Sequence, residues 1–201
     1  MKYAIQFILF YYLIFSFNIY AQEEYIIEKY KKHEGYVYDV SFSPDQEKFI
    51  SSSDDKTAII WSLESKSPLY TLEKHYAEVR CAKFRHDGKY VVTGGDKSLV
   101  IWKNTGEYIN TLTGHHTYIW TLDISKDNKY IVSGSFDNKF YLWDFNAVEN
   151  LHVFEGHEKS VLVVCFSPNG KYIASGSLDK TIKIWNTETG ENIITFPGHA
   201  D

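Results

Sequence analysis

Residues 156–185 read GHEKSVLVVCFSPNGKYIASGSLDKTIKIW, and the rest of the chain repeats the spacing of this stretch. It contains a Gly-His pair, an apolar run, a Ser-Pro-Asn-Gly turn, a second run that ends in aspartate, and a tryptophan six residues after that aspartate. The aspartate–tryptophan pair occurs four times, with steps of 41, 41 and 42 residues, at Asp55/Trp61, Asp96/Trp102, Asp137/Trp143 and Asp179/Trp185. A repeat near 40 residues with these markers predicts one four-stranded propeller blade per repeat.

Each repeat carries local signals of antiparallel strands. The segment Ser167-Pro168-Asn169-Gly170 is typical of a hairpin turn, because proline fixes φ while asparagine and glycine accept positive φ. Ser43-Pro44-Asp45 lies at the same place in the first repeat. Between Thr181 and Trp185 the isoleucines occupy every second position, which is the alternation of a half-buried strand. A further, outer strand is predicted before each repeated histidine, including one at 25–31. We therefore expect an all-β fold, a β-propeller of four-stranded antiparallel blades.

These residues closely resemble the WD-repeat (WD40) β-propeller family over residues 25–201. Only Trp143-Asp144 keeps the namesake dipeptide. The repeats run at about 33–73, 75–113, 115–155 and 157–197, within a propeller domain at 22–201, and the chain ends at the start of a fifth. Rings of this family commonly have about seven blades. The sequence thus predicts a fragment or an interrupted reading frame of a larger protein, and so part of a larger ring. An open arc and a ring completed by a second copy are the alternatives, and open blade edges predict self-association.

The resemblance also implies a buried hydrogen-bond chain that links tryptophan, a serine or threonine, histidine and aspartate in every blade. The four sets are Trp61/Ser51/His33/Asp55, Trp102/Thr93/His75/Asp96, Trp143/Ser133/His115/Asp137 and Trp185/Ser175/His157/Asp179. The second repeat is one residue shorter between Thr93 and Asp96, so its turn is predicted to be the least regular. Loss of one member would leave buried polar groups unpaired.

Serine, histidine and aspartate together also suggest a hydrolase, but four copies in register favour a structural network over a single catalytic site. The histidines do not cluster as metal ligands would, and no phosphate-binding glycine loop occurs. We therefore expect no enzyme activity, no metal, no cofactor and no small-molecule substrate.

Charge and the N-terminus bear on partners and location. The 26 acidic and 21 basic residues are scattered, without a basic stripe that could neutralise phosphates, so we do not expect nucleic acid as a partner.

Residues 1–21 have Lys2 as their one charge and are largely apolar. They are predicted to be a signal peptide cleaved after Ala21, which implies a secreted or periplasmic protein. A membrane anchor at residues 3–21 and an internal apolar strand are the alternatives.

The family's binding positions lie three and five residues after each histidine and just before each turn aspartate. Here they form an aromatic-rich set, from which the predicted partner-binding residues are Tyr36, Tyr38, Arg80, Tyr118, Trp120, Phe136, Leu162 and Leu178. The core face is assigned instead to residues four, seven and nine after the histidine, among them Val37, Val40 and Phe42, and Ile119, Leu122 and Ile124. Tyrosine, tryptophan and arginine dominate interface hot spots, although these aromatics could equally pack between blades.

The resemblance implies a rigid, non-catalytic platform. The favoured function is an exported protein-interaction scaffold that binds a protein or peptide on the channel-mouth face. The alternative is the truncated N-terminal propeller portion of a secreted multidomain enzyme.

Overall fold

The computed structural model describes residues 30–198, and all of these except residues 30 and 31 belong to one compact unit. The predicted signal peptide, the alternative anchor at 3–21, and His199 lie outside the described residues. So does most of the outer strand expected at 25–31, whose last two residues, Tyr30 and Lys31, are not in a strand. Within the described part, no helix has the length and apolar character needed to cross a bilayer.

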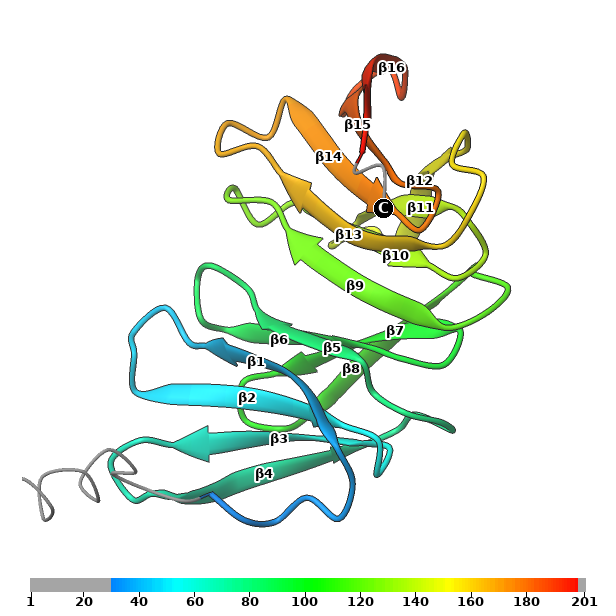
Figure 1. Ribbon diagram of the computed structural model, residues 1–201. Helices are drawn as coiled ribbons and strands as arrows, with labels where there is room; N and C mark the ends of the chain where they lie inside the picture. Colours follow the sequence, from blue (N-terminus) through cyan, green and yellow to red (C-terminus); the bar gives the residue numbers. More distant parts are fainter. Residues whose placement is uncertain (1–29, 199–201) are drawn as a thin grey trace, which may run out of the picture. The chain divides into compact units, whose positions relative to one another are not determined.

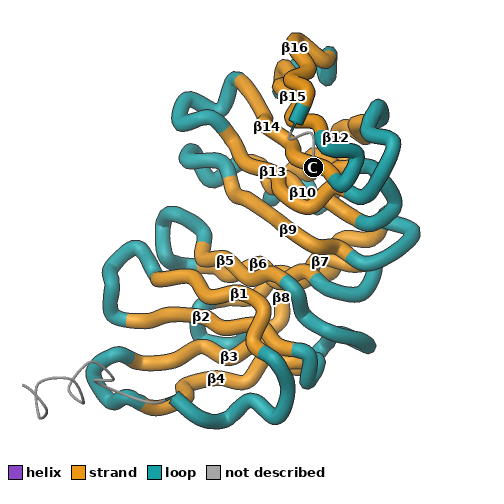
Figure 2. The backbone as a smooth tube through the Cα atoms, in the orientation of Figure 1, coloured by secondary structure: helices purple, strands orange, loops and turns teal. Residues whose placement is uncertain are grey.

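The described chain forms four antiparallel sheets of four consecutive strands each, which confirms the predicted all-β architecture (Figures 1 and 2). The first two sheets, called blades one and two here, consist of β1 (Val37–Phe42), β2 (Lys48–Ser53), β3 (Thr57–Ser62), β4 (Ser67–Glu73), β5 (Cys81–Phe84), β6 (Tyr90–Gly94), β7 (Ser98–Lys103) and β8 (Tyr108–Thr113). Blades three and four consist of β9 (Ile119–Ile124), β10 (Tyr130–Ser135), β11 (Phe140–Asp144), β12 (Glu149–Phe154), β13 (Val161–Phe166), β14 (Tyr172–Ser177), β15 (Thr181–Asn186) and β16 (Asn192–Pro197).

The first hairpin turn of every blade has one residue in the left-handed region. These residues are Gln46, Gly88, Asn128 and Gly170, with φ between 61° and 71°. Glycine and asparagine adopt this conformation at little cost, which explains three of the four positions. The turn therefore sets the same strand register in each blade.

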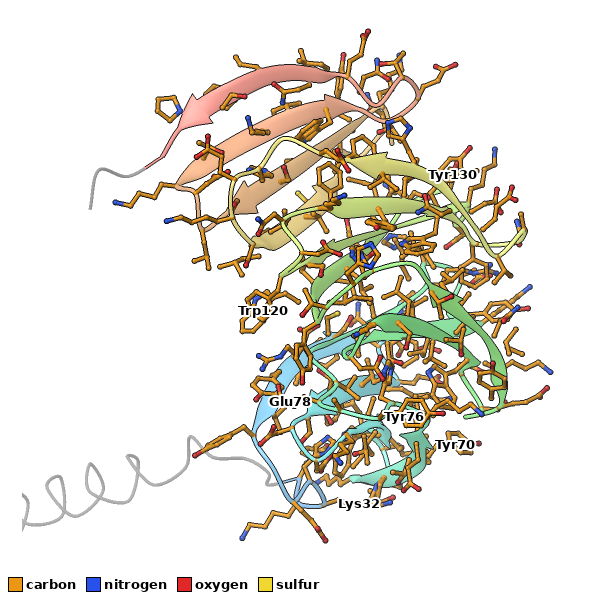
Figure 3. The ribbon with its side chains drawn as sticks, turned by 90° about the vertical axis from the view of Figure 1, so that its right-hand side faces the viewer. Lys32, Tyr70, Tyr76, Glu78, Trp120 and Tyr130 are labelled. Atoms are coloured by element: carbon orange, nitrogen blue, oxygen red, sulfur yellow. The ribbon has the colours of Figure 1, made fainter. Side chains whose placement is uncertain are left out.

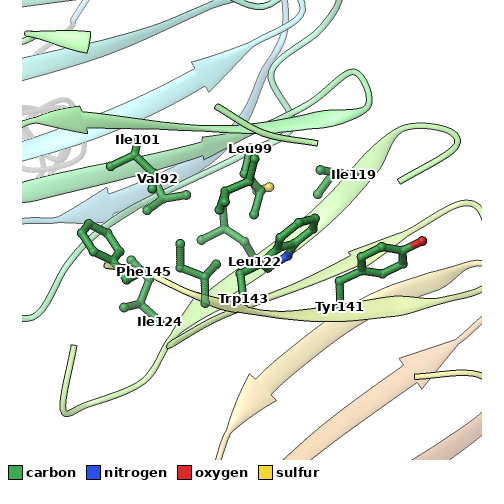
Figure 4. Packing of buried hydrophobic residues seen from close by; sticks show 12 residues of the cluster. Val92, Leu99, Ile101, Ile119, Leu122, Ile124, Tyr141, Trp143 and Phe145 are labelled. Atoms are coloured by element: carbon green, nitrogen blue, oxygen red, sulfur yellow. The ribbon is translucent and has the colours of Figure 1, made fainter. Parts of the chain in front are cut away.

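Neighbouring blades pack face to face, and their innermost strands β1, β5, β9 and β13 lie in succession. Blades two and three enclose the cluster shown in Figure 4, in which Val92 and Leu99 of one blade meet Ile119, Leu122 and Trp143 of the other. Equivalent clusters join blades one and two, and blades three and four. Burial of these apolar faces is the main force that holds successive blades together.

The two terminal blades each expose an apolar face. Val37, Val40 and Phe42 of blade one are 51%, 62% and 67% exposed, so their assignment to the core was wrong. The matching Ile119, Leu122 and Ile124 of blade three are buried, as expected. The difference arises because these positions are covered only by a preceding blade, which blade one lacks in the described chain.

Candidate functional site

A hydrogen-bond chain runs through the interior of blade four. The indole N–H of Trp185 donates to Ser175 Oγ at 2.8 Å, and this oxygen lies 2.7 Å from His157 Nε2. His157 Nδ1 lies 2.7 Å from Asp179 Oδ2, which also accepts the backbone N–H of Glu158 at 3.0 Å. The chain thus connects the core indole to the turn that carries the aspartate.

The structure brings together all four predicted sets. The indole donates to Ser51, Thr93 and Ser133 at 2.8, 3.0 and 2.8 Å in blades one to three. In the same order, the distances from histidine Nε2 to the hydroxyl oxygen are 2.7, 2.8 and 2.8 Å, involving His33, His75 and His115. The distances from histidine Nδ1 to the carboxylate are 2.8, 3.4 and 2.8 Å, involving Asp55, Asp96 and Asp137.

One protonation pattern gives every group of such a hydrogen-bond chain a partner. If histidine Nδ1–H donates to the aspartate, Nε2 accepts the hydroxyl proton, and the hydroxyl oxygen accepts the indole N–H. Burial alone would raise the pKa of Asp55, but hydrogen bonds from Thr57, the Glu34 N–H and His33 outweigh it and lower that pKa to about 2. The equivalent hydrogen bonds likewise overcome burial and lower the pKa values of Asp96, Asp137 and Asp179. The folded state therefore favours ionised aspartates.

Blade two has the longest histidine–aspartate contact, at 3.4 Å. The other three turns place a left-handed residue directly after the aspartate, namely Lys56, Asn138 and Lys180. In blade two the residue after Asp96 is Lys97, which is not in that conformation, and its backbone N–H instead donates to Asp96 Oδ1 at 2.7 Å. In blade two the imidazole thus faces Asp96 Oδ1, the oxygen that the Lys97 N–H also engages, whereas in the other three blades the imidazole faces the aspartate Oδ2.

The serines of these chains are poor candidates for a nucleophile. Ser51, Ser133 and Ser175 are at most 3% exposed, and each hydroxyl is already engaged by both indole and imidazole. A nucleophile must reach its substrate with a free lone pair. The geometry therefore fits a structural role.

Within residues 30–198, no group of three or more histidine, cysteine or carboxylate side chains is arranged to hold a metal ion.

A second group of residues, all of them predicted binding residues except Glu78, meets at the rim, where β1, β5 and β9 begin. We call Tyr38, Glu78, Arg80, Tyr118, Trp120 and Phe136 the rim cluster. The guanidinium carbon of Arg80 lies 4.7 Å from the ring centroid of Tyr38, 4.4 Å from that of Trp120 and 5.9 Å from that of Tyr118. Arg80 thus joins aromatic rings of blades one and three by cation–π contacts.

The remaining contacts of the rim cluster hold it in place. Arg80 forms a salt bridge to Glu78, which is itself 3.5 Å from the Tyr38 hydroxyl. The rings of Trp120 and Phe136 are 5.0 Å apart, and the backbone N–H of Phe136 donates to the Tyr118 carbonyl. Glu78 and Trp120 lie at the same edge of the sheets in Figure 3. The rim is therefore ordered by contacts within the chain.

Exposure divides the predicted binding residues. Tyr36, Tyr38, Tyr118 and Leu178 are 79%, 39%, 40% and 51% exposed, whereas Trp120, Phe136 and Leu162 are partly buried. Tyr36 and Leu178 make none of the ring contacts described for the rim cluster. Sequence reasoning missed Tyr76, which is 91% exposed. It recognised Glu78 as one of the family's binding positions, three residues after His75, but did not include it in the predicted site, although an acidic residue two positions before Arg80 signals a pair.

A pocket of about 250 Å³ opens beside the rim cluster and is lined by residues of all four blades. Tyr38, Arg80, Trp120 and Leu162 form part of its wall, and Asp39 and Lys83 place both signs of charge inside it. Residues far apart in the sequence thus face one shared space, as expected at the centre of a propeller.

The repeated four-stranded sheets, their interior hydrogen-bond chains and the shared central pocket define a repeat protein built from propeller blades. The "WD domain, G-beta repeat" family model matches residues 25–62, 66–103, 106–144 and 148–186. These matches cover well over half of the chain, and the chain belongs to the WD40 repeat family.

The proteins to which this chain is similar differ widely. The chain is 27% identical over 143 residues to nuclear distribution protein nudF 2 of Penicillium rubens, covering 61% of this chain and 31% of that protein. It is 38% identical over 112 residues to apoptotic protease-activating factor 1 of Rattus norvegicus, covering 50% of this chain and 9% of that protein. With eukaryotic translation initiation factor 3 subunit I of Schizosaccharomyces pombe it shares 35% identity over 83 residues, covering 40% of this chain and 25% of that protein. The chain thus matches less than a third of the length of each of these relatives.

Proposed function

We propose that this chain is a non-catalytic protein-interaction scaffold that binds a protein or peptide at the rim cluster. WD40 repeats typically serve as such scaffolds. The observation that carries the proposal is the cation–π contact of Arg80 with both Tyr38 and Trp120, with the ring centroid of the exposed Tyr118 also 5.9 Å from the guanidinium carbon. Tyrosine, tryptophan and arginine are the residue types that contribute most to binding energy at protein interfaces.

The rim cluster is suited to binding because it is already ordered. A surface whose side chains are held in place loses little conformational entropy when a partner arrives. The salt bridge between Arg80 and Glu78 keeps a cation and an anion side by side at the edge of the aromatic surface. A partner that presents an aliphatic or aromatic side chain flanked by polar groups would satisfy both the rings and the charges.

Two further observations support a scaffold over an enzyme. The hydroxyls of the Ser-His-Asp sets are buried and doubly engaged. The names of these relatives concern nuclear distribution, apoptosis and translation initiation, so the shared repeat is not tied to one reaction. Those names suggest no particular partner for this chain.

The test compares two substitutions in the rim cluster, Tyr118→Ala and Trp120→Ala, with a control substitution at an exposed tyrosine elsewhere. Tyr118→Ala removes a rim residue that is 40% exposed, and Tyr172→Ala removes a residue of β14 outside the rim cluster that is 43% exposed. Immobilised wild type and variants are incubated with an extracellular extract, and captured proteins are quantified. Tyr118→Ala and Trp120→Ala should each reduce capture at least about tenfold, whereas Tyr172→Ala should not. Equal capture by all three variants would refute the rim as the binding surface.

We also propose that the scaffold is exported. The support is the charged start, the apolar run and the small residue Ala21 within residues 1–21. N-terminal sequencing of protein recovered from the medium or periplasm should begin at Gln22. Recovery of the intact Met1 terminus in the membrane fraction would favour an anchor instead.

A further inference from the structure

An arginine and two aromatic rings fill the joint between blades two and three. The guanidinium carbon of Arg85 lies 4.3 Å from the ring centroid of Tyr90 and 4.4 Å from that of Phe145. The two rings meet edge to face, with their centroids 5.3 Å apart. Arg85 also donates to both carboxylate oxygens of Asp87. The guanidinium is therefore held by two rings and a carboxylate of its own chain.

Blade three retains the residues that hold this arginine but not the arginine itself. Tyr130 begins β10 as Tyr90 begins β6. The backbone N–H of Ser125 donates to the Tyr130 carbonyl at 2.9 Å, as that of Arg85 does to the Tyr90 carbonyl. Ser125 thus stands at the position of Arg85. In both turns an aspartate follows two residues later, and in blade three it is Asp127.

The aromatic ring that closes the preceding joint is also replaced. Phe145 lies two residues after Trp143 and is 6% exposed. The residue two positions after Trp185 in blade four is Thr187. Tyr130 packs on the core of blades three and four, but within residues 30–198 its ring has no aromatic or cation–π partner. Two smaller side chains therefore leave space around this tyrosine.

Two pockets share Tyr130 as a wall in this joint. One, which we call the Tyr130 pocket, has a volume of about 350 Å³ and lies among Ser125, Asp127, Tyr130 and the turn at 168–170 of blade four. The other has about 600 Å³ and extends to Thr187. Both volumes fall in the range of about 300–1,000 Å³ that is usual for ligand sites. The Tyr130 pocket occupies the place that the arginine side chain takes in the preceding joint.

The carboxylate in this pocket has one oxygen available for a further cation. Asp127 Oδ1 accepts the Ser125 hydroxyl at 2.6 Å and the Lys129 N–H at 3.1 Å. Asp127 Oδ2 lies 3.9 Å from Lys129 Nζ, and both side chains are more than half exposed. An ion pair of this kind is weak, so a better placed cation can replace the lysine.

Stacking and hydrogen bonding, more than net charge, would select the ligand, because Lys126 also lines the Tyr130 pocket. A guanidinium is flat, stacks on aromatic faces and donates paired N–H groups to a carboxylate, whereas an ammonium is a compact, strongly hydrated charge. The joint between blades two and three shows that a tyrosine and an aspartate at these positions hold a guanidinium in this fold.

We propose that the Tyr130 pocket binds a guanidinium group, stacked on Tyr130 and hydrogen-bonded to Asp127 Oδ2. Free arginine and the arginine side chains of peptides both carry this group. Figure 3 shows Tyr130 at the opposite edge of the sheets from Trp120 and Glu78. The site is therefore separate from the rim cluster.

The test follows the backbone amide resonances of the isotope-labelled full chain by nuclear magnetic resonance. The probes are two capped tripeptides, acetyl-Gly-Arg-Gly-amide and acetyl-Gly-Lys-Gly-amide. Resonances of Asp127, Tyr130 and Gly170 should shift saturably with the arginine tripeptide, and the lysine tripeptide should bind severalfold more weakly. A titration with free arginine identifies the source of the group: tighter binding of the tripeptide indicates a peptide ligand, and tighter binding of free arginine indicates a small molecule.

A variant that supplies its own guanidinium should block the site. Ser125→Arg places in blade three the arginine that blade two has, and it should weaken binding of the arginine tripeptide at least about tenfold. Ser43→Arg is the matched control and should bind as wild type does. Ser43 Oγ donates to Asp45 and accepts the Lys48 N–H in blade one, as Ser125 Oγ donates to the turn aspartate and accepts the N–H five residues later.

Two further variants test the contacts singly. Tyr130→Leu removes the ring and Asp127→Asn the charge, and each should weaken binding about two- to fivefold. Circular dichroism melts identify any variant that fails to fold. Absence of saturable shifts in wild type, equal affinity for the two tripeptides, or undiminished binding by Ser125→Arg would overturn the guanidinium site. None of these outcomes bears on the rim cluster, which the capture experiment tests.

Discussion

The guanidinium carbon of Arg80 lies 4.4 Å from the ring centroid of Trp120, although one residue belongs to blade two and the other to blade three. The same carbon lies 4.7 Å from the ring centroid of Tyr38, which belongs to blade one. One cation therefore spans the rim of three blades. The aromatic residues expected to await a partner are already arranged around a residue of their own chain.

Arg80→Met should destabilise the protein by about 1–2 kcal/mol, because two cation–π contacts within 5 Å are lost while most of the side-chain volume remains. Urea unfolding followed by circular dichroism measures the change. Lys97→Met, at an exposed position, removes a charge elsewhere and should leave the midpoint unchanged. Equal midpoints for Arg80→Met and wild type would show that the stacking contributes nothing to stability.

His157→Ala should cost about 1–3 kcal/mol for each buried group left unpaired, since Ser175 and Asp179 both lose their imidazole partner. Trp185→Phe should be destabilising for the same reason, through loss of the indole N–H. His116→Ala is the control, because this histidine is exposed and contacts Asp137 only through its backbone N–H among the hydrogen bonds described. Thermal melts that are identical for His157→Ala and His116→Ala would contradict the proposed role of the network.

The stability lost when the network histidine is replaced should differ between blades. His75 Nδ1 is 3.4 Å from Asp96, whereas His115 Nδ1 is 2.8 Å from Asp137. His75→Ala should therefore destabilise the protein less than His115→Ala, because a weaker hydrogen bond is lost. Parallel urea titrations of the two variants compare them directly, and a larger loss for His75→Ala would mean that packing, not hydrogen bonding, sets the cost.

Low pH should destabilise the fold by protonating the Asp55 carboxylate of the blade-one hydrogen-bond network. Its pKa is lowered from 3.8 to about 2 in the folded state, so its ionisation stabilises the fold fully above about pH 5. That contribution is lost as the pH falls through 3.8 towards 2. Asp55→Asn should be less stable than wild type at pH 7, and the difference should shrink between pH 5 and pH 2. A difference independent of pH would indicate that the carboxylate's charge is not what stabilises the turn.

The sequence alone determined the blades and their interiors. The Trp61, Ser51, His33 and Asp55 set could be assigned because a repeat places equivalent residues in equivalent environments, so four imperfect copies reinforce one pattern. The hairpin turns were equally predictable, since glycine, asparagine and proline act through local backbone conformation. Even the irregular turn at Asp96 followed from counting one missing residue.

Contacts between blades were decided by the tertiary structure. The sequence indicates which face of a strand is apolar, but burial depends on whether another blade covers that face. Val40 is exposed, and Leu122 at the equivalent position of blade three is buried, for this reason. Likewise, the meeting of Tyr38, Arg80 and Trp120 depends on the angle between successive blades, which is a property of packed faces and is encoded in no single repeat.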